Sequence, residues 1–247
     1  MRKVFLGAAA AAALVSPGLA QAQTTGSINL GLEFTDYDSG SGVDGYNLGA
    51  TVMHDMGGMT VQLDGRTTLQ RWDSSGDYSH SYAAAHVSTD MGGWDLGGFV
   101  GLANYYGDGG TLVGAEARGA YGNFSFDGSI TFTDFLDSNY SGIGYRLNGS
   151  YFFTPNFAVS AGWAQTDIDS WTDFDVDEFS VGGAYQMANG TALSLTYTNA
   201  EYGPFSNESD SILLGARFNF GGGTLQDNTN DGAWMAAEQN ANTWSRW

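Results

Sequence analysis

The chain has 247 residues, of which 27 are acidic and 8 are lysine or arginine, so its formal net charge is −19 at pH 7. A chain this acidic is a poor partner for nucleic acid, because nucleic-acid-binding proteins neutralise phosphates with basic side chains. It contains no cysteine, which excludes disulfide bonds and thiolate metal sites. Aromatic residues make up 14% of the chain, which argues against a disordered polypeptide.

The first residues have the features of an export signal. Arg2 and Lys3 precede a stretch without polar side chains from Val4 to Val15. Ala20 and Ala22 follow with the spacing of a small-residue cleavage site. The apolar stretch is too short to cross a membrane as a helix, so we expect residues 1–22 to be a cleaved signal peptide.

From Ser27 onward apolar residues recur at every second position, which is the period of a β-strand rather than of an amphipathic helix. In the first segment Ile28, Leu30 and Leu32 alternate with polar or small residues. The pattern predicts about twelve strands: Ser27–Tyr37, Tyr46–His54, Met59–Leu69, a segment around Ala83–Val87, Trp94–Asn104, Thr111–Tyr121, Phe124–Phe132, Tyr145–Phe153, Phe157–Gln165, Phe179–Met187, Thr191–Thr198 and Ser211–Phe220.

One hairpin pattern occurs twice. Leu48–Gly58 is echoed by Ala83–Gly93, and both copies end in Asp-Met-Gly-Gly. The echo fixes the register of the second copy, because it places Ala83, Ala85 and Val87 on one face and His86 on the other. A repeated strand-turn-strand unit is expected in an antiparallel meander.

The predicted connections alternate between short and long. The short ones are Asp55–Gly58, Met91–Gly93, Gly122–Asn123, Thr154–Asn156 and Ala188–Gly190. The long ones are Asp38–Gly45, Gln70–His80, Tyr105–Gly110, Thr133–Gly144, Thr166–Glu178 and Asn199–Asp210. Short periplasmic turns, long external loops and an even strand count are typical of transmembrane β-barrels.

Aromatic residues gather at both ends of the predicted strands. One group flanks the short turns: Trp94, Tyr121, Phe124, Phe153, Phe157, Tyr185 and Phe220. The other lies towards the long loops: Phe34, Tyr46, Tyr145, Trp163, Phe179 and Tyr197. Two aromatic belts on one apolar face favour a membrane barrel over a soluble β-sandwich, which also has alternating strands.

The last predicted strand, Ser211–Phe220, has an apolar face, a polar face with Arg217, and a terminal Phe220. It resembles the closing strand of Gram-negative outer-membrane β-barrels of the porin-like family, in which the final Phe is an assembly signal. The resemblance implies an all-β, antiparallel, up-and-down transmembrane barrel over residues 23–220, located in the outer membrane. Its implied partners are outer-membrane lipid, lipopolysaccharide and the barrel assembly machinery.

Strand parity predicts which charged residues face the lumen. A charge on the lipid face costs ~2–4 kcal/mol near the membrane midplane, so a shared inward parity is informative. We interpret these residues either as a charged constriction that selects solutes or as ion pairs that stiffen and partly plug the barrel. The set is Glu33, Asp64, Arg66, Glu116, Arg118, Asp127, Arg146 and Arg217.

The predicted loops carry most of the acidic residues. We expect the richest stretch to form an acidic external rim that concentrates cations and bridges lipopolysaccharide through divalent ions. Its Asp173-x-Asp175-x-Asp177 spacing is a weak calcium motif, because no glycine follows at the sixth position. The predicted rim is Asp167, Asp169, Asp173, Asp175, Asp177 and Glu178.

Residues 221–247 continue beyond the closing strand. Gly221–Gly223 can act as a hinge, so the segment lies in the periplasm or folds back into the pore. Asp227–Glu238 partly matches a calcium-binding loop, but no helix can precede it after three glycines. We expect a flexible periplasmic tail with one short helix around Trp234–Asn240, and no metal site.

These features predict an outer-membrane channel for passive diffusion of small hydrophilic solutes, with a preference for cations. A closed structural or surface barrel is the alternative, and an outer-membrane hydrolase is the third hypothesis. His86 and Ser88 resemble the His-x-Ser pair of outer-membrane phospholipases, but here their predicted parity is inward rather than towards lipid. We therefore expect neither catalysis nor a cofactor.

Overall fold

The computed structural model describes residues 24–72, 76–105, 107–135, 140–169, 173–203 and 207–246, so the expected signal peptide lies outside the described residues. Among the described residues, no helix combines the length and apolar character needed to cross a membrane. The strands are β1 (Thr24–Tyr37), β2 (Gly42–Asp55), β3 (Met59–Trp72), β4 (Gly76–Asp90), β5 (Trp94–Tyr105), β6 (Asp108–Tyr121), β7 (Phe124–Phe135), β8 (Ser141–Thr154), β9 (Phe157–Asp169), β10 (Phe174–Gln186), β11 (Thr191–Tyr202) and β12 (Asn207–Phe220).

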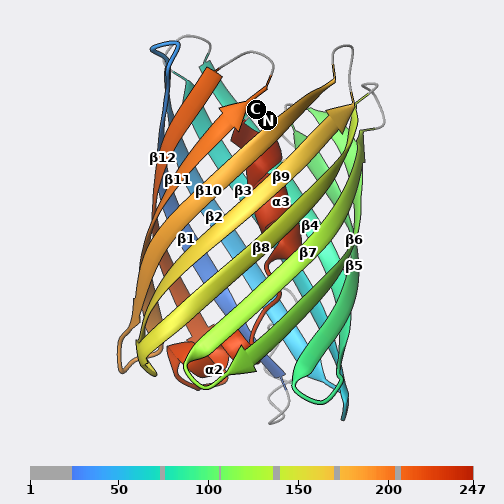
Figure 1. The fold of residues 1–247 in the computed structure, drawn as a ribbon, viewed down its shortest axis with the longest axis vertical. Coiled ribbons are helices and arrows are strands. Elements are labelled where there is room, and N and C mark those ends of the chain that lie inside the picture. The colour runs from blue at the N-terminus through green and yellow to red at the C-terminus, as the bar shows by residue number, and fades with distance from the viewer. Residues whose placement is uncertain are drawn as a thin grey trace.

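These twelve strands close into one antiparallel barrel in which each strand pairs with its neighbours in sequence and β1 pairs with β12 (Figure 1). The closing register joins Leu30 to Ala216 and Leu32 to Leu214. Closure leaves no unpaired strand edge, which is the condition for a β-structure in lipid. The predicted fold class is therefore confirmed.

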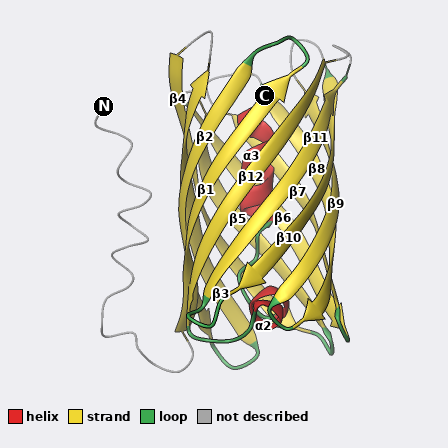
Figure 2. Cartoon of the chain, turned by 90° about the vertical axis from the view of Figure 1, so that its left-hand side faces the viewer, coloured by secondary structure: helices red, strands yellow, loops and turns green. Residues whose placement is uncertain are grey.

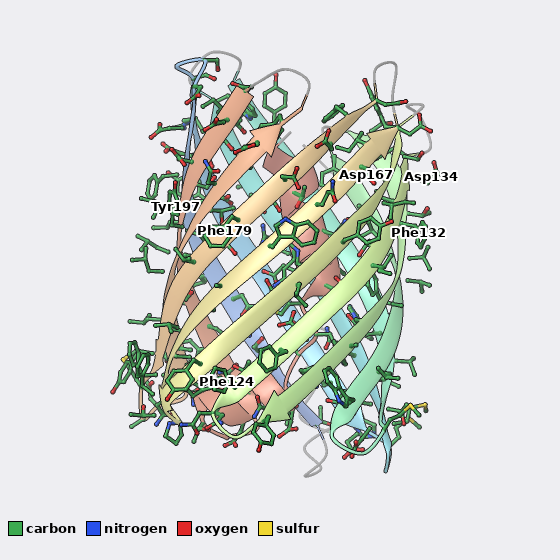
Figure 3. All side chains as sticks on the ribbon, viewed as in Figure 1. Phe124, Phe132, Asp134, Asp167, Phe179 and Tyr197 are labelled. Carbon is green, nitrogen blue, oxygen red and sulfur yellow. The ribbon has the colours of Figure 1, made fainter. Side chains whose placement is uncertain are left out.

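The predicted parity is also the observed one. Leu30, Val100 and Leu147 are exposed on the outer surface, whereas Gln62, Thr68 and other polar residues are buried inside. The aromatic belts lie on the outer surface, where Figure 3 shows Phe124 towards one end and Phe179 and Tyr197 towards the other. An apolar, aromatic-rimmed exterior around a polar interior is the arrangement that lipid requires.

The strands are longer than predicted and the long connections are correspondingly shorter. We call the end with the short turns the turn end, and the opposite end the loop end. The predicted loop Gln70–His80 is mostly strand, since β3 continues to Trp72 and β4 begins at Gly76. Beyond the aromatic belt at the loop end the outward residues are polar and face water, so the apolar alternation ends there. The backbone hydrogen bonds between strands nevertheless continue.

The C-terminal tail lies inside the barrel, unlike the flexible periplasmic extension that the sequence suggested. Two helices, α2 (Leu225–Asn230) and α3 (Ala236–Arg246), follow β12. Figures 1 and 2 show α2 at the turn end and α3 within the strand wall in two perpendicular views. Gly221, Gly222 and Gly223 all have positive φ (113°, 87° and 89°), a conformation that turns the chain inward and that other residues rarely adopt.

The parity assignment can be tested at two adjacent leucines of β12. Leu214 is exposed on the lipid face beside Leu32 and Leu195, whereas Leu213 lines a lumen cavity. Leu214→Arg should destabilise the folded barrel by ~2–4 kcal/mol, and Leu213→Arg by clearly less, because only the first places a charge in hydrocarbon. Urea unfolding in lipid vesicles measures both. Equal costs would contradict the assignment.

Candidate functional site

All eight predicted lumen residues lie on the inner face of the barrel. Five of them are buried: Glu33, Asp64, Arg66, Glu116 and Arg118. The other three are half-buried: Asp127, Arg146 and Arg217. Three of the four arginines form ion pairs with carboxylates outside the predicted set, namely Glu238, Asp95 and Glu178. The arginines therefore do not pair only with carboxylates of adjacent strands.

Arg118 of the wall contacts the tail through several groups. Its Nη1 donates to the carbonyl oxygen of Gly232 at 2.8 Å and to that of Thr229 at 3.4 Å. Its guanidinium lies 4.5 Å from the ring centroid of Trp234, in cation–π geometry. Its Nη2 is 2.8 Å from Oδ2 of Asp95 on β5. Arg118 thus holds the bend between α2 and α3 against the wall.

The other three lumen arginines also contact the tail. Arg66 Nη1 is 2.9 Å from Oε1 of Glu238. Arg146 Nη2 donates to Oγ1 of Thr243 at 3.1 Å and is 2.9 Å from Glu178 on β10. Arg217 Nη2 lies 3.1 Å from the sulfur of Met235. All four predicted lumen arginines therefore serve as tail contacts.

Gln62 of β3 clamps the tail backbone. Its Oε1 accepts from the N–H of Trp234 at 2.7 Å, and its Nε2 donates to the Trp234 carbonyl at 2.9 Å. The same Nε2 donates to Oδ1 of Asp64 at 2.8 Å. Gln62 is completely buried. Its side-chain amide satisfies both the N–H and the carbonyl of Trp234, as the backbone of a neighbouring strand would, and so fixes the position of Trp234.

A buried histidine supports that clamp. His86 Nε2 lies 2.9 Å from Oδ1 of Asp64, and Nδ1 lies 2.7 Å from Oε1 of Glu116. Its ring stacks on Phe99 with centroids 5.0 Å apart. Nδ1 forms a hydrogen bond with Glu116, whereas Nε2 lies within ion-pair distance of Asp64 without hydrogen-bond geometry. When protonated, the ring places a positive charge between the two carboxylates. His86 is therefore the counter-ion that joins Asp64 to Glu116.

His86 and Ser88 both face the lumen, as the hairpin echo predicted, and both are buried. They consequently do not present a lipid-facing pair of the phospholipase kind. The two carboxylates that hold His86 come from β3 and β6, and neither was associated with it by sequence spacing. The barrel register brings them together, because Gln62 pairs with His86 across β3 and β4 and Phe99 pairs with His86 across β4 and β5.

The first residues of the partial calcium motif, Asp227–Asn230, belong to the capped helix α2. Thr224 is the N-cap of α2, and its hydroxyl and backbone N–H exchange hydrogen bonds with Asp227. The backbone and hydroxyl of Thr224 hold the pKa of Asp227 below its usual value, whereas burial raises the pKa of Asp231. Glu238 is turned towards Arg66. Within the described residues no group of three acidic or histidine side chains is placed to hold a metal ion.

The residues of the predicted acidic rim do not all lie on the outer surface. Asp167, Asp169, Asp175 and Asp177 lie on the outer face of β9 and β10, and Figure 3 shows Asp167 on the outer surface nearer the loop end than Phe179. Asp173 is exposed just before β10. Glu178 is instead buried in the lumen, where it accepts from Thr243 at 2.7 Å. Glu178 shares the parity of inward Ser180 and Gly182, so extending the strand by one residue would have placed it correctly.

The tail fills the lumen unevenly. Ala236 and Ala237 of α3 are buried in a cluster with inward residues of β4, β5 and β6, among them Tyr82, Phe99 and Leu112. On the opposite side a cavity of about 280 Å³ separates the tail from β1, β2, β11 and β12. A smaller cavity of about 90 Å³ lies near Trp234 and Asp127. The lumen is therefore occupied but not completely packed.

Several residues of the site were missed from sequence. Strand parity alone gives no partner for Gln62, and Glu238 stands out in the sequence only as the last residue of the partial calcium motif. The Thr-x-x-Asp capping box at Thr224–Asp227 was the available sign that a helix begins immediately after the glycines. It indicates where the helix begins, but not that the tail is held inside the barrel.

No protein-family model and no curated protein matches this sequence. The structure is similar to an outer membrane channel from Pseudomonas putida F1, with a TM-score of 0.63 and 15% identity over 83% of this chain and 100% of that chain. It is also similar to the translocator domain of the autotransporter NalP from Neisseria meningitidis, with a TM-score of 0.53 and 11% identity over 86% and 94% of the two chains. A third similar structure is the KdgM porin in complex with disordered oligogalacturonate, with a TM-score of 0.52 and 10% identity over 78% and 99%. The chain has the closed-barrel fold of these outer-membrane proteins.

Proposed function

We propose that the protein is an outer-membrane channel for passive diffusion of small hydrophilic solutes, and that its own C-terminal tail gates the channel. The observation that carries this proposal is the contact of Arg66, Arg118, Arg146 and Arg217 with the tail. These contacts are polar and solvent-compatible, so the same wall can face either the tail or water.

In this proposal the tail detaches from the barrel wall at the turn end. Residues 221–223 provide a glycine hinge, and α2 touches the wall through the turns: Gln226 Nε2 donates to the carbonyl of Gly122, and Leu225 N–H donates to Oδ1 of Asn156. Each such neutral hydrogen bond contributes only ~0.5–1.5 kcal/mol, because water replaces it on opening. The turn end of the barrel faces the periplasm in this proposal, so release delivers the tail there.

The proposal includes a cation preference. The outward acids at the loop end, such as Asp167 and Asp169, raise the local concentration of cations around the mouth. Inside, Asp95, Asp127 and Glu178 oppose the arginines. The same outer acids suit contact with lipopolysaccharide through divalent cations, and Phe220 suits recognition by the barrel assembly machinery.

Reversal potentials under a salt gradient test this preference. We expect cation selectivity at low salt that fades as the Debye length falls from ~30 Å at 0.01 M to ~3 Å at 1 M. Anion selectivity at low salt would mean that the lumen arginines dominate, and it would contradict the preference while leaving the channel intact. Planar bilayers without any conductance, with or without the tail, would instead favour the closed structural barrel.

A further inference from the structure

The larger lumen cavity, of about 280 Å³, has the composition of a binding site. It lies between the tail and the closing seam of the barrel, with Met235 on one side and Asn29 and Arg217 on the other. Most of its wall is small or apolar, including Ala184, Ala192 and Leu213. Binding sites for small molecules are typically concave and mainly apolar, with a few polar groups that fix orientation.

Arg217 is the unusual member of this wall. Its Nε donates to Oδ1 of Asn29 at 2.8 Å, and its Nη2 contacts only the sulfur of Met235, a weak acceptor. Within the described part of the chain Arg217 forms no ion pair, whereas Arg66, Arg118 and Arg146 each have a carboxylate within 2.9 Å. A guanidinium is always charged and carries five donors. The cavity therefore contains a cation whose charge is not neutralised.

Two further groups restrict what can bind there. Asn47 lines the cavity, and its Nδ2 is buried without a hydrogen-bond partner among the described residues. A ligand with an acceptor atom could satisfy this donor. Glu238 also lines the cavity and is held by Arg66. The Glu238 carboxylate disfavours a second negative charge on the ligand.

We propose that this cavity binds a small organic monocarboxylate, whose carboxylate pairs with Arg217 and whose body lies against Ala184, Ala192 and Leu213. An arginine can grip a carboxylate with two parallel hydrogen bonds, which a neutral isostere cannot reproduce. The bound acid replaces the sulfur of Met235 as the partner of Nη2. The proposal concerns binding and holds whether or not the barrel conducts.

Isothermal titration calorimetry of the purified full chain in detergent tests the proposal, with benzoate as the probe and benzamide as its neutral isostere. Benzoate should bind the wild-type chain about tenfold or more tightly than benzamide does, since a charge-assisted bond is lost in the amide. Arg217→Gln should weaken benzoate by a similar factor. Arg71→Gln, the same change at an exposed arginine of the outer surface, should leave benzoate binding unchanged.

Ala184→Leu provides a second variant that fills the cavity and leaves Arg217 in place, and it should weaken benzoate about tenfold or more through steric exclusion. It decides the question if Arg217→Gln fails to fold, as judged by circular dichroism. Absence of benzoate binding to the wild type overturns the proposal. So does Arg217→Gln binding within twofold of wild type, or equal affinity for benzamide. Displacement of benzoate by an equal concentration of inorganic phosphate would make this a general anion site and overturn the assigned ligand class.

Discussion

Deletion of residues 221–247 should convert a mostly closed barrel into a permanently open one. The tail contributes hydrogen bonds to charged groups at Arg66, Arg118 and Arg146, each of which contributes ~1.5–3 kcal/mol. Because 1.4 kcal/mol corresponds to a tenfold change in an equilibrium, the open population should rise by far more than about tenfold. Single-channel recording in planar bilayers measures the mean current of the full and the shortened chain.

A control of the same length distinguishes loss of the tail's contacts from removal of the segment that fills the lumen. A full-length chain with Trp234→Ser, Glu238→Ser and Gln239→Ser keeps the tail and its backbone hydrogen bonds to Arg118 and Gln62, but removes the side-chain contacts with Arg118, Arg66 and Asn148. Its current should lie between that of the full chain and that of the deletion. If the shortened chain fails to assemble in the outer membrane, the tail is part of the barrel core and not a gate. If it assembles and its current equals that of the full chain, the tail does not close the pore.

Replacement of His86 should cause the largest loss of stability in the wall. His86→Ala leaves Asp64 and Glu116 buried and facing each other without their shared counter-ion. Removing one partner of a buried ion pair typically costs ~3–5 kcal/mol, and the lost stacking on Phe99 adds to this. Urea unfolding in lipid vesicles measures the change. His54→Ala, at an exposed histidine near the turn end, should cost less than about 1 kcal/mol.

A refinement of the same experiment isolates the electrostatic cause. Glu116→Gln in the His86→Ala background removes one of the two repelling charges and should recover part of the lost stability. No recovery in the double variant would mean that the cavity left by the imidazole ring, rather than the carboxylate pair, accounts for the loss.

The fold was predictable because the barrel imposes a rule on every residue. A strand in lipid must place apolar side chains outward at every second position, so Leu30, Leu147 and Leu214 could be assigned from parity alone. The lumen residues followed from the same rule. Which of them meet could not be derived, because partners such as Asp64 and Glu116 lie on different strands and depend on the register of the intervening ones.

The tail was harder to predict for a different reason. Its helices are too short to be stable alone, and their order depends on contacts with a wall that sequence patterns do not place near them. Trp234 illustrates the point, since its position follows from Gln62 and Arg118 on two distant strands. The same applies to Glu178, which looks like a loop acid until the strand is seen to include it.

The most direct test of the account joins the tail to the wall covalently. Thr133 of β7 and Asn240 of α3 are buried, and their side-chain oxygens are 3.0 Å apart. The chain has no cysteine, so Thr133→Cys with Asn240→Cys introduces the only thiols, which a short reducible cross-linker can bridge. The single-channel current of this variant is then recorded before and after reduction. A tail that gates the channel from inside the lumen predicts a closed barrel while cross-linked and return of channel openings on reduction. Failure of the two thiols to cross-link, or equal currents in both states, would contradict it.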